Sequence, residues 1–323
     1  MNKYSRTFSI AKRAIGNYIG NGPLCVSFEI THDCNARCKH CHRGGIVDTN
    51  RATPERFGEM YRQLRPPVVQ ISGGEPLLRR DVDDIIRAIK QPDGTPYTIF
   101  VTNAALLKPE KYHSLAATGV DAFSVSFDFP DERHDEFRNI PGLFGRIRDL
   151  CKSVADCECN CITLNSVVHS KNFRDLLRMA EVAREWGVSI NYSPYTWLRT
   201  DDRSFVIQGD DLAEFEGIVD RLIDFKHKHG TIRTTDSFFH DMVSFFRTGS
   251  QPGCRAGERF LVVNPDATLS PCGLIITAYT SLGELKEKFS KSNTCTACNT
   301  SIRAATEKPF NNLVPTALRA LVS

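Results

Sequence analysis

The sequence lacks the features of a secreted or membrane-spanning protein. Residues 1–19, MNKYSRTFSIAKRAIGNYI, contain no long apolar core and no small-residue cleavage pattern, so they do not form a secretory signal. No later apolar run reaches the length that a membrane span needs. We therefore expect a cytoplasmic protein, in a compartment where thiols stay reduced.

Strong net charge, sequence repeats and low-complexity tracts are also missing. The formal net charge is only +3 and no block of like charge occurs, which argues against a nucleic-acid partner. A chain of 323 residues with 41% hydrophobic residues can bury a sizeable core. These properties predict one large domain, or one domain with a small appendage.

Cysteine occurs at 12 of the 323 positions, which is too sparse for a disulfide scaffold in a chain of this size. Three of these residues, Cys34, Cys38 and Cys41, are clustered in the stretch CNARCKHC with the spacing C-x3-C-x2-C. Three thiolates on one short loop can hold three corners of an iron–sulfur cubane and leave the fourth iron open. An open iron can bind a substrate or a cofactor, so this spacing indicates catalysis.

Zinc is the alternative metal for this loop. Zinc sites usually have four ligands, often with histidine among them, and the same stretch contains His32, His40 and His42. The residues alone leave both metals open.

A second group of cysteines follows residue 250, where the chain becomes richer in Cys, Pro, Asn and Gly. Its members are Cys254, Cys272, Cys295 and Cys298. The segments FLVVNP and TLSPC predict two strands that form a hairpin around an Asp-Ala turn. Four thiolates make a complete ligand set, for which a zinc ribbon is the usual structural interpretation.

Strand-like and helix-like segments alternate between residues 24 and 192. The predicted strands are 24–31, 68–71, 98–102, 122–127, 161–169 and 188–192, and the predicted helices are 53–64, 81–90, 109–118, 142–154 and 173–186, with two more at 210–229 and 237–247. The alternation predicts a parallel sheet with helical crossovers. Six units are too few for a closed eight-stranded barrel, so we predict an α/β fold with a partial, open (β/α)6 TIM-like barrel.

Polar stretches follow several of the predicted strands. In parallel α/β folds, functional residues gather where the strands end. The stretches are the cysteine loop, Gly73–Gly74–Glu75–Pro76, Thr102–Asn103, Ser126–Asp128 and Asn165. We therefore expect all of them on one rim of the barrel.

The spacing C-x3-C-x2-C after the first strand and the motif GGEP after the second resemble the radical S-adenosylmethionine (SAM) enzymes, over residues 24–200. The residue before the third cysteine, commonly aromatic in that family, is His40 here. The resemblance implies that Cys34, Cys38 and Cys41 ligate a [4Fe–4S] cluster. The open iron of this cluster would chelate the amino and carboxylate groups of SAM.

The resemblance also assigns cofactor contacts to the rim. Gly73 and Gly74 would let the backbone approach the cofactor, and Glu75, with the adjacent carbonyls, would meet the SAM ammonium. The remaining expected cofactor-binding residues are Pro76, Thr102, Asn103, Ser126, Asp128 and Asn165. For the last three of these, turn or strand-end hydrogen bonds are the alternative.

The reaction implied by the resemblance is reductive. One electron from a reducing partner, such as a flavodoxin or ferredoxin, would break the C–S bond of SAM and give methionine and a 5′-deoxyadenosyl radical. The radical would then remove hydrogen from a C–H bond of a small-molecule or peptide substrate. The alternatives are a redox-neutral adenosylation or rearrangement of a lipid-like or isoprenoid-like substrate, and a non-catalytic zinc or iron–sulfur module.

The second cysteine group resembles the twitch domain, a shortened relative of the auxiliary-cluster domain called SPASM. The pattern is CRAG, NPD and PC followed by CTAC, with Asp266–Ala267 at the usual Asp-Gly turn. It implies one auxiliary [4Fe–4S] cluster held by four cysteines, suited to electron transfer and hence to a net oxidation. We expect an N-terminal extension over 1–22, the barrel and its linking helices over 23–250, and an auxiliary domain with a C-terminal helix over 251–323.

Aromatic residues and the remaining cysteines are weaker candidates. Tyr192, Tyr195 and Trp197 follow the sixth strand, where they either line a substrate cavity or pack the barrel mouth. Cys157, Cys159 and Cys161 alternate along the chain and form either a third metal site or inert buried thiols.

The two terminal segments are apolar and lightly basic. Segments Ser9–Ile19 and Leu313–Val322 either cover the barrel, as we expect, or lie on a membrane surface.

Overall fold

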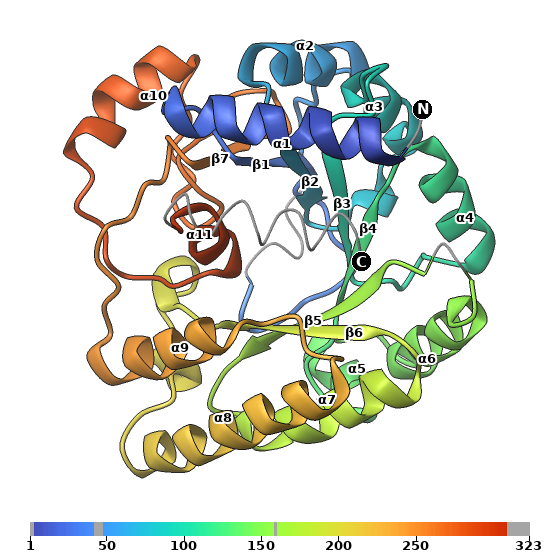
Figure 1. Ribbon diagram of the computed structural model, residues 1–323, viewed down its shortest axis with the longest axis vertical. Coiled ribbons are helices and arrows are strands. Elements are labelled where there is room, and N and C mark those ends of the chain that lie inside the picture. The colour runs from blue at the N-terminus through green and yellow to red at the C-terminus, as the bar shows by residue number, and fades with distance from the viewer. Residues whose placement is uncertain (1–2, 42–47, 158–159, 309–323) are drawn as a thin grey trace.

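A curved sheet of eight strands forms the centre of the computed structural model, which describes residues 3–41, 48–157 and 160–308 (Figure 1). The strand order is β6-β5-β4-β3-β2-β1-β7-β8. The first six strands are β1 (Cys25–Thr31), β2 (Val68–Gly73), β3 (Tyr97–Thr102), β4 (Ala122–Ser126), β5 (Ile162–Val168) and β6 (Ser189–Pro194). Each pairs in parallel with its neighbour in the sequence, so the predicted partial (β/α)6 barrel is confirmed.

Alternate residues of the barrel strands lie in two different environments. In β5, Ile162 and Leu164 are buried, whereas Thr163 and Asn165 are half-buried. Strands β2, β3, β4 and β6 show a similar alternation. Because successive side chains of a strand point to opposite faces, the sheet has one face packed against helices and one face that borders open space.

The predicted crossover helices cover the convex face of the sheet (Figure 1). They are α2 (Pro54–Leu64), α3 (Val82–Ile89), α4 (Pro109–Thr118), α6 (Leu143–Val154) and α7 (Leu176–Glu185), and α8 (Asp210–His229) and α9 (Asp236–Thr248) follow them. Local sequence sets the start of α2, since the Thr53 side chain accepts a hydrogen bond from Arg56 N and Pro54 lies in the first turn. A short helix that the sequence analysis did not include, α5 (Arg133–Arg138), precedes α6.

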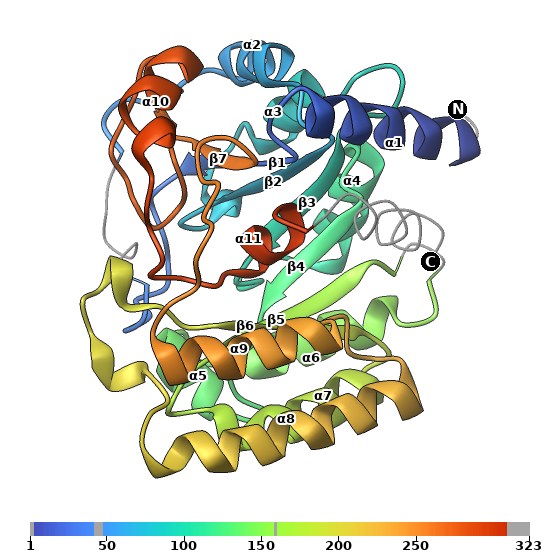
Figure 2. The same ribbon diagram turned by 60° about the vertical axis from the view of Figure 1, so that its left-hand side comes forward.

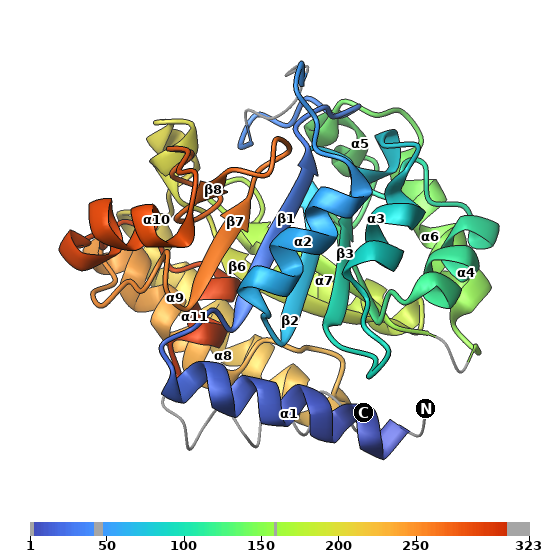
Figure 3. The ribbon, with the colours of Figure 1, turned by 90° about the horizontal axis from the view of Figure 1, so that it is seen from above.

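The N-terminal helix α1 (Lys3–Ile19) lies across the N-terminal ends of the strands (Figure 3). An ion pair between Arg6 and Asp121 and a hydrogen bond from Arg13 to the Tyr61 hydroxyl hold it there. The segment 9–19 therefore packs on the barrel, as expected, whereas Leu313–Val322 lies outside the described residues. In the described ranges, no helix has both the length and the apolar character needed to cross a membrane.

The C-terminal part continues the barrel sheet. It contains β7 (Phe260–Val263), β8 (Leu269–Ser270), α10 (Leu282–Lys288) and α11 (Ser301–Thr306). β7 and β8 form the predicted antiparallel hairpin, and β7 also pairs in parallel with β1. Ala267 has φ +66° at the turn position where the related pattern has glycine. The hairpin thus shares a sheet with the barrel. The domain boundary near residue 250 stays a prediction.

Helix α11 occupies the open side of the barrel. It contacts both β6 and β7 and lies on the concave side of the sheet (Figure 2). Ser301 N, at its start, donates to Ser193 Oγ of β6 at 3.1 Å. The C-terminal segment therefore bridges the gap that six strands leave unclosed.

Candidate active site

The cysteine loop, residues 32–41, leaves the C-terminal end of β1 and lies against the turn that follows β2. Gly74 N donates to Thr31 O at 2.7 Å, and Glu75 N donates to Asp33 O at 2.8 Å. The GGEP turn therefore holds the start of the loop through backbone atoms.

Gly73 and Gly74 make this contact possible. A Cβ at position 73 would lie 2.0 Å from Thr31 O, and one at position 74 would lie 2.2 Å from Asp33 O. Gly73 also has φ +130°, a conformation that residues with a side chain rarely adopt. The sequence analysis attributed both glycines to close approach of a cofactor, and the structure shows that they allow close approach of the cysteine loop itself.

The Glu75 carboxylate is fully buried and ties the end of β2 to the end of β3. It accepts hydrogen bonds from Thr102 Oγ1 at 2.7 Å, Asn103 N at 2.8 Å and Leu77 N at 3.2 Å. Burial raises the pKa of Glu75 to about 6, although these hydrogen bonds act in the opposite direction. The buried Pro76 begins a 3-10 turn directly after it. Four of the predicted cofactor residues thus form one connected group.

Asn103 connects this group to the cysteine loop. Its side-chain Nδ2 donates to Asn35 Oδ1 at 2.7 Å and lies 4.0 Å from Cys34 Sγ. The ends of β2 and β3 therefore both support the loop that carries the thiols.

The three thiols of the loop lie close enough to interact electrostatically. Burial raises the pKa of Cys38 to about 11, and the nearby Arg138 guanidinium offsets only part of this effect. A backbone N–H lies 3.4 Å from Cys34 Sγ, and Arg199 Nη1 lies 3.7 Å from Cys41 Sγ. A metal cluster bound here would supply the positive charge that keeps buried sulfurs as thiolates.

Asp128 and Arg138 form a buried ion pair beside the loop. Arg138 Nε and Nη2 lie 2.7 and 2.6 Å from Asp128 Oδ2. Arg37 N, in the cysteine loop, donates to Arg138 O at 3.2 Å. Burial opposes ionisation of Asp128, but Arg138 and neighbouring histidines outweigh it and hold the pKa of Asp128 at about 2.

Four buried polar atoms near this ion pair have no hydrogen-bond partner among the described residues. They are Asp128 Oδ1, His40 Nδ1, His134 Nε2 and His169 Nε2. The rings of His40 and His169 each stack on Phe137, with centroids 5.0 Å apart in both pairs. Buried polar atoms are normally satisfied by a partner, a water or a ligand, so this cluster fits a polar cofactor beside the cysteine loop.

Ser126, the last residue of β4, lies opposite Asn165, which is in the middle of β5. Both are half-buried, and Asn165 Oδ1 accepts a hydrogen bond from Asn191 Nδ2 of β6 at 3.0 Å. These two residues therefore face the barrel interior, with Ser126 at the edge that carries the cysteine loop.

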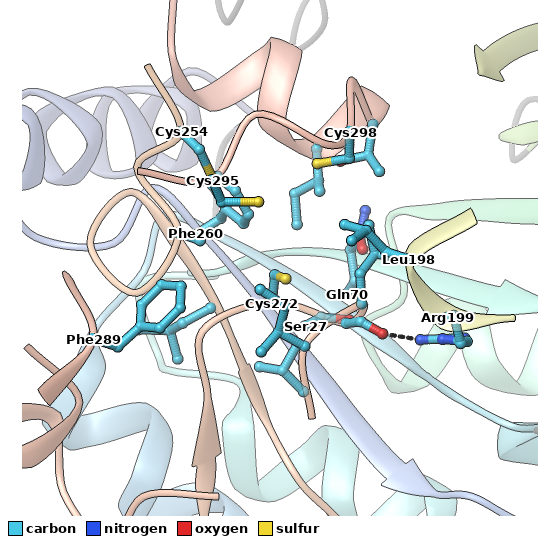
Figure 4. Close-up of a pocket in the computed structure, with 18 residues that line it drawn as sticks. Ser27, Gln70, Leu198, Arg199, Cys254, Phe260, Cys272, Phe289, Cys295 and Cys298 are labelled. Carbon is cyan, nitrogen blue, oxygen red and sulfur yellow. Dashed lines mark hydrogen bonds between the residues drawn. The ribbon is translucent and has the colours of Figure 1, made fainter. Parts of the chain in front are cut away.

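The four cysteines of the second group line a single cavity of about 200 Å³, and their sulfur atoms turn toward a common space (Figure 4). Burial raises the pKa of Cys272 to about 12 and that of Cys298 to about 11. The fully buried Arg303 donates to Cys298 O at 2.6 Å and lies 3.9 Å from Cys298 Sγ. This segment therefore gathers a complete ligand set around one hollow, with a cation beside it.

Within the described ranges, no three Cys, His, Asp or Glu side chains converge tightly enough to share a single metal ion. Zinc ligands must meet at one point, with Zn–S distances of about 2.3 Å, whereas the cysteines of a cubane bind separate irons. His32, one of the zinc candidates, pairs with Glu29 Oε2 at 3.0 Å, and His42 lies outside the described residues.

Arg199 is a site residue that the sequence analysis missed. It ends the 3-10 turn Trp197–Arg199 after β6. Its guanidinium contacts Cys41 Sγ on one side and Gly273 O, beside Cys272, on the other. The available signal was its position, just beyond the C-terminal end of a barrel strand. Arg199 thus joins the two cysteine groups.

The three aromatic candidates all make packing contacts. Tyr192 is fully buried and donates to Leu176 O of α7 at 2.7 Å. The Tyr195 hydroxyl donates to Asp202 O at 2.9 Å, and Trp197 stacks on Phe245. A substrate role for these residues stays a prediction.

The CECNC cysteines stay only partly described. Cys161 Sγ lies 3.4 Å from the Tyr112 hydroxyl, which also accepts from Cys161 N, and Cys159 lies outside the described residues. A third metal site there stays a prediction.

We predict that Gly74→Ala destabilises the protein by about 2–3 kcal/mol, because the new methyl group collides with rigid backbone at Asp33. Gly217→Ala, in α8, is the matched control: no atom lies within 4 Å of its added Cβ, so it should stabilise by about 1 kcal/mol. Urea unfolding followed by circular dichroism measures both. Equal stability of Gly74→Ala and the parent would contradict the contact described.

Glu75 should make stability depend on pH. Its pKa is raised to about 6 from 4.5, so its contribution is complete below about pH 4.5 and is lost as the pH rises through about 6. The loss amounts to about 2 kcal/mol. In Glu75→Gln, the difference in unfolding free energy between pH 4.5 and pH 7, measured with urea, should be smaller by this amount. The variant of an exposed residue, Glu59→Gln, should keep the parent's difference. A Glu75→Gln variant with the parent's pH dependence would refute this account.

Comparison with known proteins agrees with this geometry. The pattern that defines the Radical SAM superfamily matches residues 28–183. Over 175 residues, the chain is 32% identical to the AdoMet-dependent heme synthase of Methanosarcina barkeri, a match that covers 52% of this chain and 49% of that protein. The chain thus spans about half the length of this curated relative.

Two solved structures share the fold. The structure of Streptococcus suis SuiB bound to S-adenosylmethionine has a TM-score of 0.66 at 18% identity and covers 84% of this chain and 67% of that chain. Native anSMEcpe with bound AdoMet and Cp18Cys peptide has a TM-score of 0.62 at 14% identity and covers 93% of this chain and 98% of that one. From the sequence match we conclude that residues 28–183 form a domain of the Radical SAM superfamily, whose members use SAM and a [4Fe–4S] cluster, and the two solved structures share its fold.

Proposed function

We propose that this chain cleaves SAM reductively and uses the resulting radical to oxidise a substrate C–H bond. With SAM bound and one electron supplied by a reductant such as a flavodoxin or ferredoxin, the chemistry available is C–S cleavage to methionine and a 5′-deoxyadenosyl radical. The substrate loses a hydrogen atom to this radical, then a proton to solvent and an electron to an acceptor. The proposed substrate is a small molecule or a peptide.

The observation that carries the proposal is the arrangement of two cysteine groups around one barrel. Cys34, Cys38 and Cys41 provide three thiolates, one fewer than a cubane has irons, so one iron is left for SAM. The unpartnered polar atoms of Asp128 and His169 lie in the same region. They suit the hydroxyl and amine groups of a nucleoside cofactor. The Arg138 guanidinium keeps a positive charge beside the thiolates.

We assign the second cysteine group to an auxiliary [4Fe–4S] cluster, which would supply an acceptor for the substrate's electron. Cys254, Cys272, Cys295 and Cys298 together leave no iron open, so this cluster has no position for substrate. Arg199 contacts both Cys41 Sγ and Gly273 O, so the two cysteine groups lie within reach of one side chain. A net oxidation therefore fits this site better than a redox-neutral adenosylation.

Replacement of Cys38 should abolish SAM cleavage. We expect Cys38→Ala to lose most of the iron of the first site and to release no 5′-deoxyadenosine when the reconstituted protein receives SAM and dithionite. Cys151→Ala, which removes a buried thiol from α6 outside both groups, should keep both properties. Chromatography of the products and iron analysis measure the outcome, and cleavage of SAM at the parent rate by Cys38→Ala would refute the proposed ligand set.

Replacement of Cys272 should remove the second cluster and leave SAM cleavage at the first site intact. We expect Cys272→Ala to bind about half of the parent's iron, since one of two four-iron clusters is lost, while it still releases 5′-deoxyadenosine. Electron paramagnetic resonance of the reduced protein should show one cluster signal in place of two. A second site filled by zinc in the parent protein, measured by elemental analysis after anaerobic purification, would overturn the auxiliary-cluster assignment.

A further inference from the structure

The inner face of the barrel carries small polar side chains. At positions that point inward, the strands have Gln70, Ser124, Thr163, Asn165 and Asn191, all lining one cavity of about 470 Å³. In a filled barrel, large branched apolar residues occupy such positions and close the interior. Here the short hydroxyl and amide groups leave the interior hollow.

The opposite wall of this cavity is apolar. Helix α1 contributes Ile10, Ala11, Ala14 and Ile15, and α11 contributes Ile302. Strand residues such as Val68, Ile99 and Phe123 are apolar as well, so the lining is mainly hydrocarbon with small polar groups interspersed. A ligand that fills the cavity must therefore present a mainly apolar surface with a few hydrogen-bonding groups.

Among the residues that the structure describes, two cations and no carboxylate belong to the lining. Arg233 is exposed at the edge of the cavity, where its Nε donates to Ser189 Oγ at 3.0 Å. Lys308 also lines the cavity, but it lies within electrostatic reach of Asp241. Arg233 is thus the group best placed to bind an anion at the edge of the cavity.

This cavity adjoins the four-cysteine cavity. Gln70 and Ile302 line both of them. A ligand inside the barrel therefore lies beside the four-cysteine cavity.

We propose that the barrel interior binds an anionic amphiphile as substrate: a compact, mainly hydrocarbon body with a carboxylate or phosphate at Arg233. This inference rests on the proposed function for its catalytic role, but binding can be tested by itself. The volume of about 470 Å³ lies within the usual range for small-molecule pockets.

Isothermal titration calorimetry on the cluster-loaded full-length protein tests the head-group requirement. The probes are dodecyl phosphate, dodecanol and dodecylamine, each below its critical micelle concentration, because they share one tail and differ in charge. We expect dodecyl phosphate to bind at least about tenfold more tightly than dodecylamine. Arg233→Gln should remove that preference without changing dodecanol binding, and Lys228→Gln, an exposed cation on α8, should leave it intact.

Blocking variants test the location. Ala14→Trp fills the cavity from α1 and Thr163→Phe fills it from β5, so each should abolish binding of dodecyl phosphate, whereas Lys12→Trp on the exposed side of α1 should not. Circular dichroism checks that each variant is folded. Binding that survives both blocking variants, or that is equal for all three head groups, overturns the inference.

The two proposals can fail separately. If the parent protein cleaves SAM but does not bind dodecyl phosphate, the substrate class is wrong and the radical chemistry stands. If it binds dodecyl phosphate and loses that binding in Ala14→Trp, yet never releases 5′-deoxyadenosine with SAM and dithionite, the cavity stands and the proposed function is wrong.

Discussion

The contact between the GGEP turn and the backbone of the cysteine loop is the constraint on which the site depends. Two N–H donors of the turn reach carbonyls at Thr31 and Asp33, and any Cβ on Gly73 or Gly74 would occupy the same space. Glu75 then extends the contact to β3 through buried hydrogen bonds. Three strands are thereby locked together beneath the thiols, so the loop has a rigid base although it contains little regular structure of its own.

The barrel of six strands is incomplete, and the C-terminal segment closes part of the gap. Six strands cannot close a ring, and in this chain β7 extends the sheet beyond β1 while α11 spans from β7 toward β6. The C-terminal segment is therefore part of the barrel wall as well as the carrier of four cysteines. The interior that it helps to enclose has short polar side chains among the mainly apolar residues of its lining.

Periodicity predicted the barrel well because the crossover helices and strands carry clear local signals. Thr53 and Pro54 mark the start of α2, and the alternation in 162–168 marks β5. α1 escaped prediction as a helix, since its basic and apolar residues carry no capping signal, and its packing depends on distant partners such as Asp121. The pairing of Asp128 with Arg138 and the reach of Arg199 to Cys41 also depend on three-dimensional proximity, which sequence spacing does not encode. The candidate residues were therefore easier to find than their partners.

Arg199 lies between the two cysteine groups. The guanidinium of Arg199 meets a sulfur of the first cysteine group and a carbonyl next to the second, and it comes from neither segment. If the C-terminal cysteine segment were exchanged for that of a relative, Arg199 would lose its partner at Gly273. An exchange of C-terminal segments between such enzymes should then succeed only when the residues that follow β6 are exchanged together with that segment.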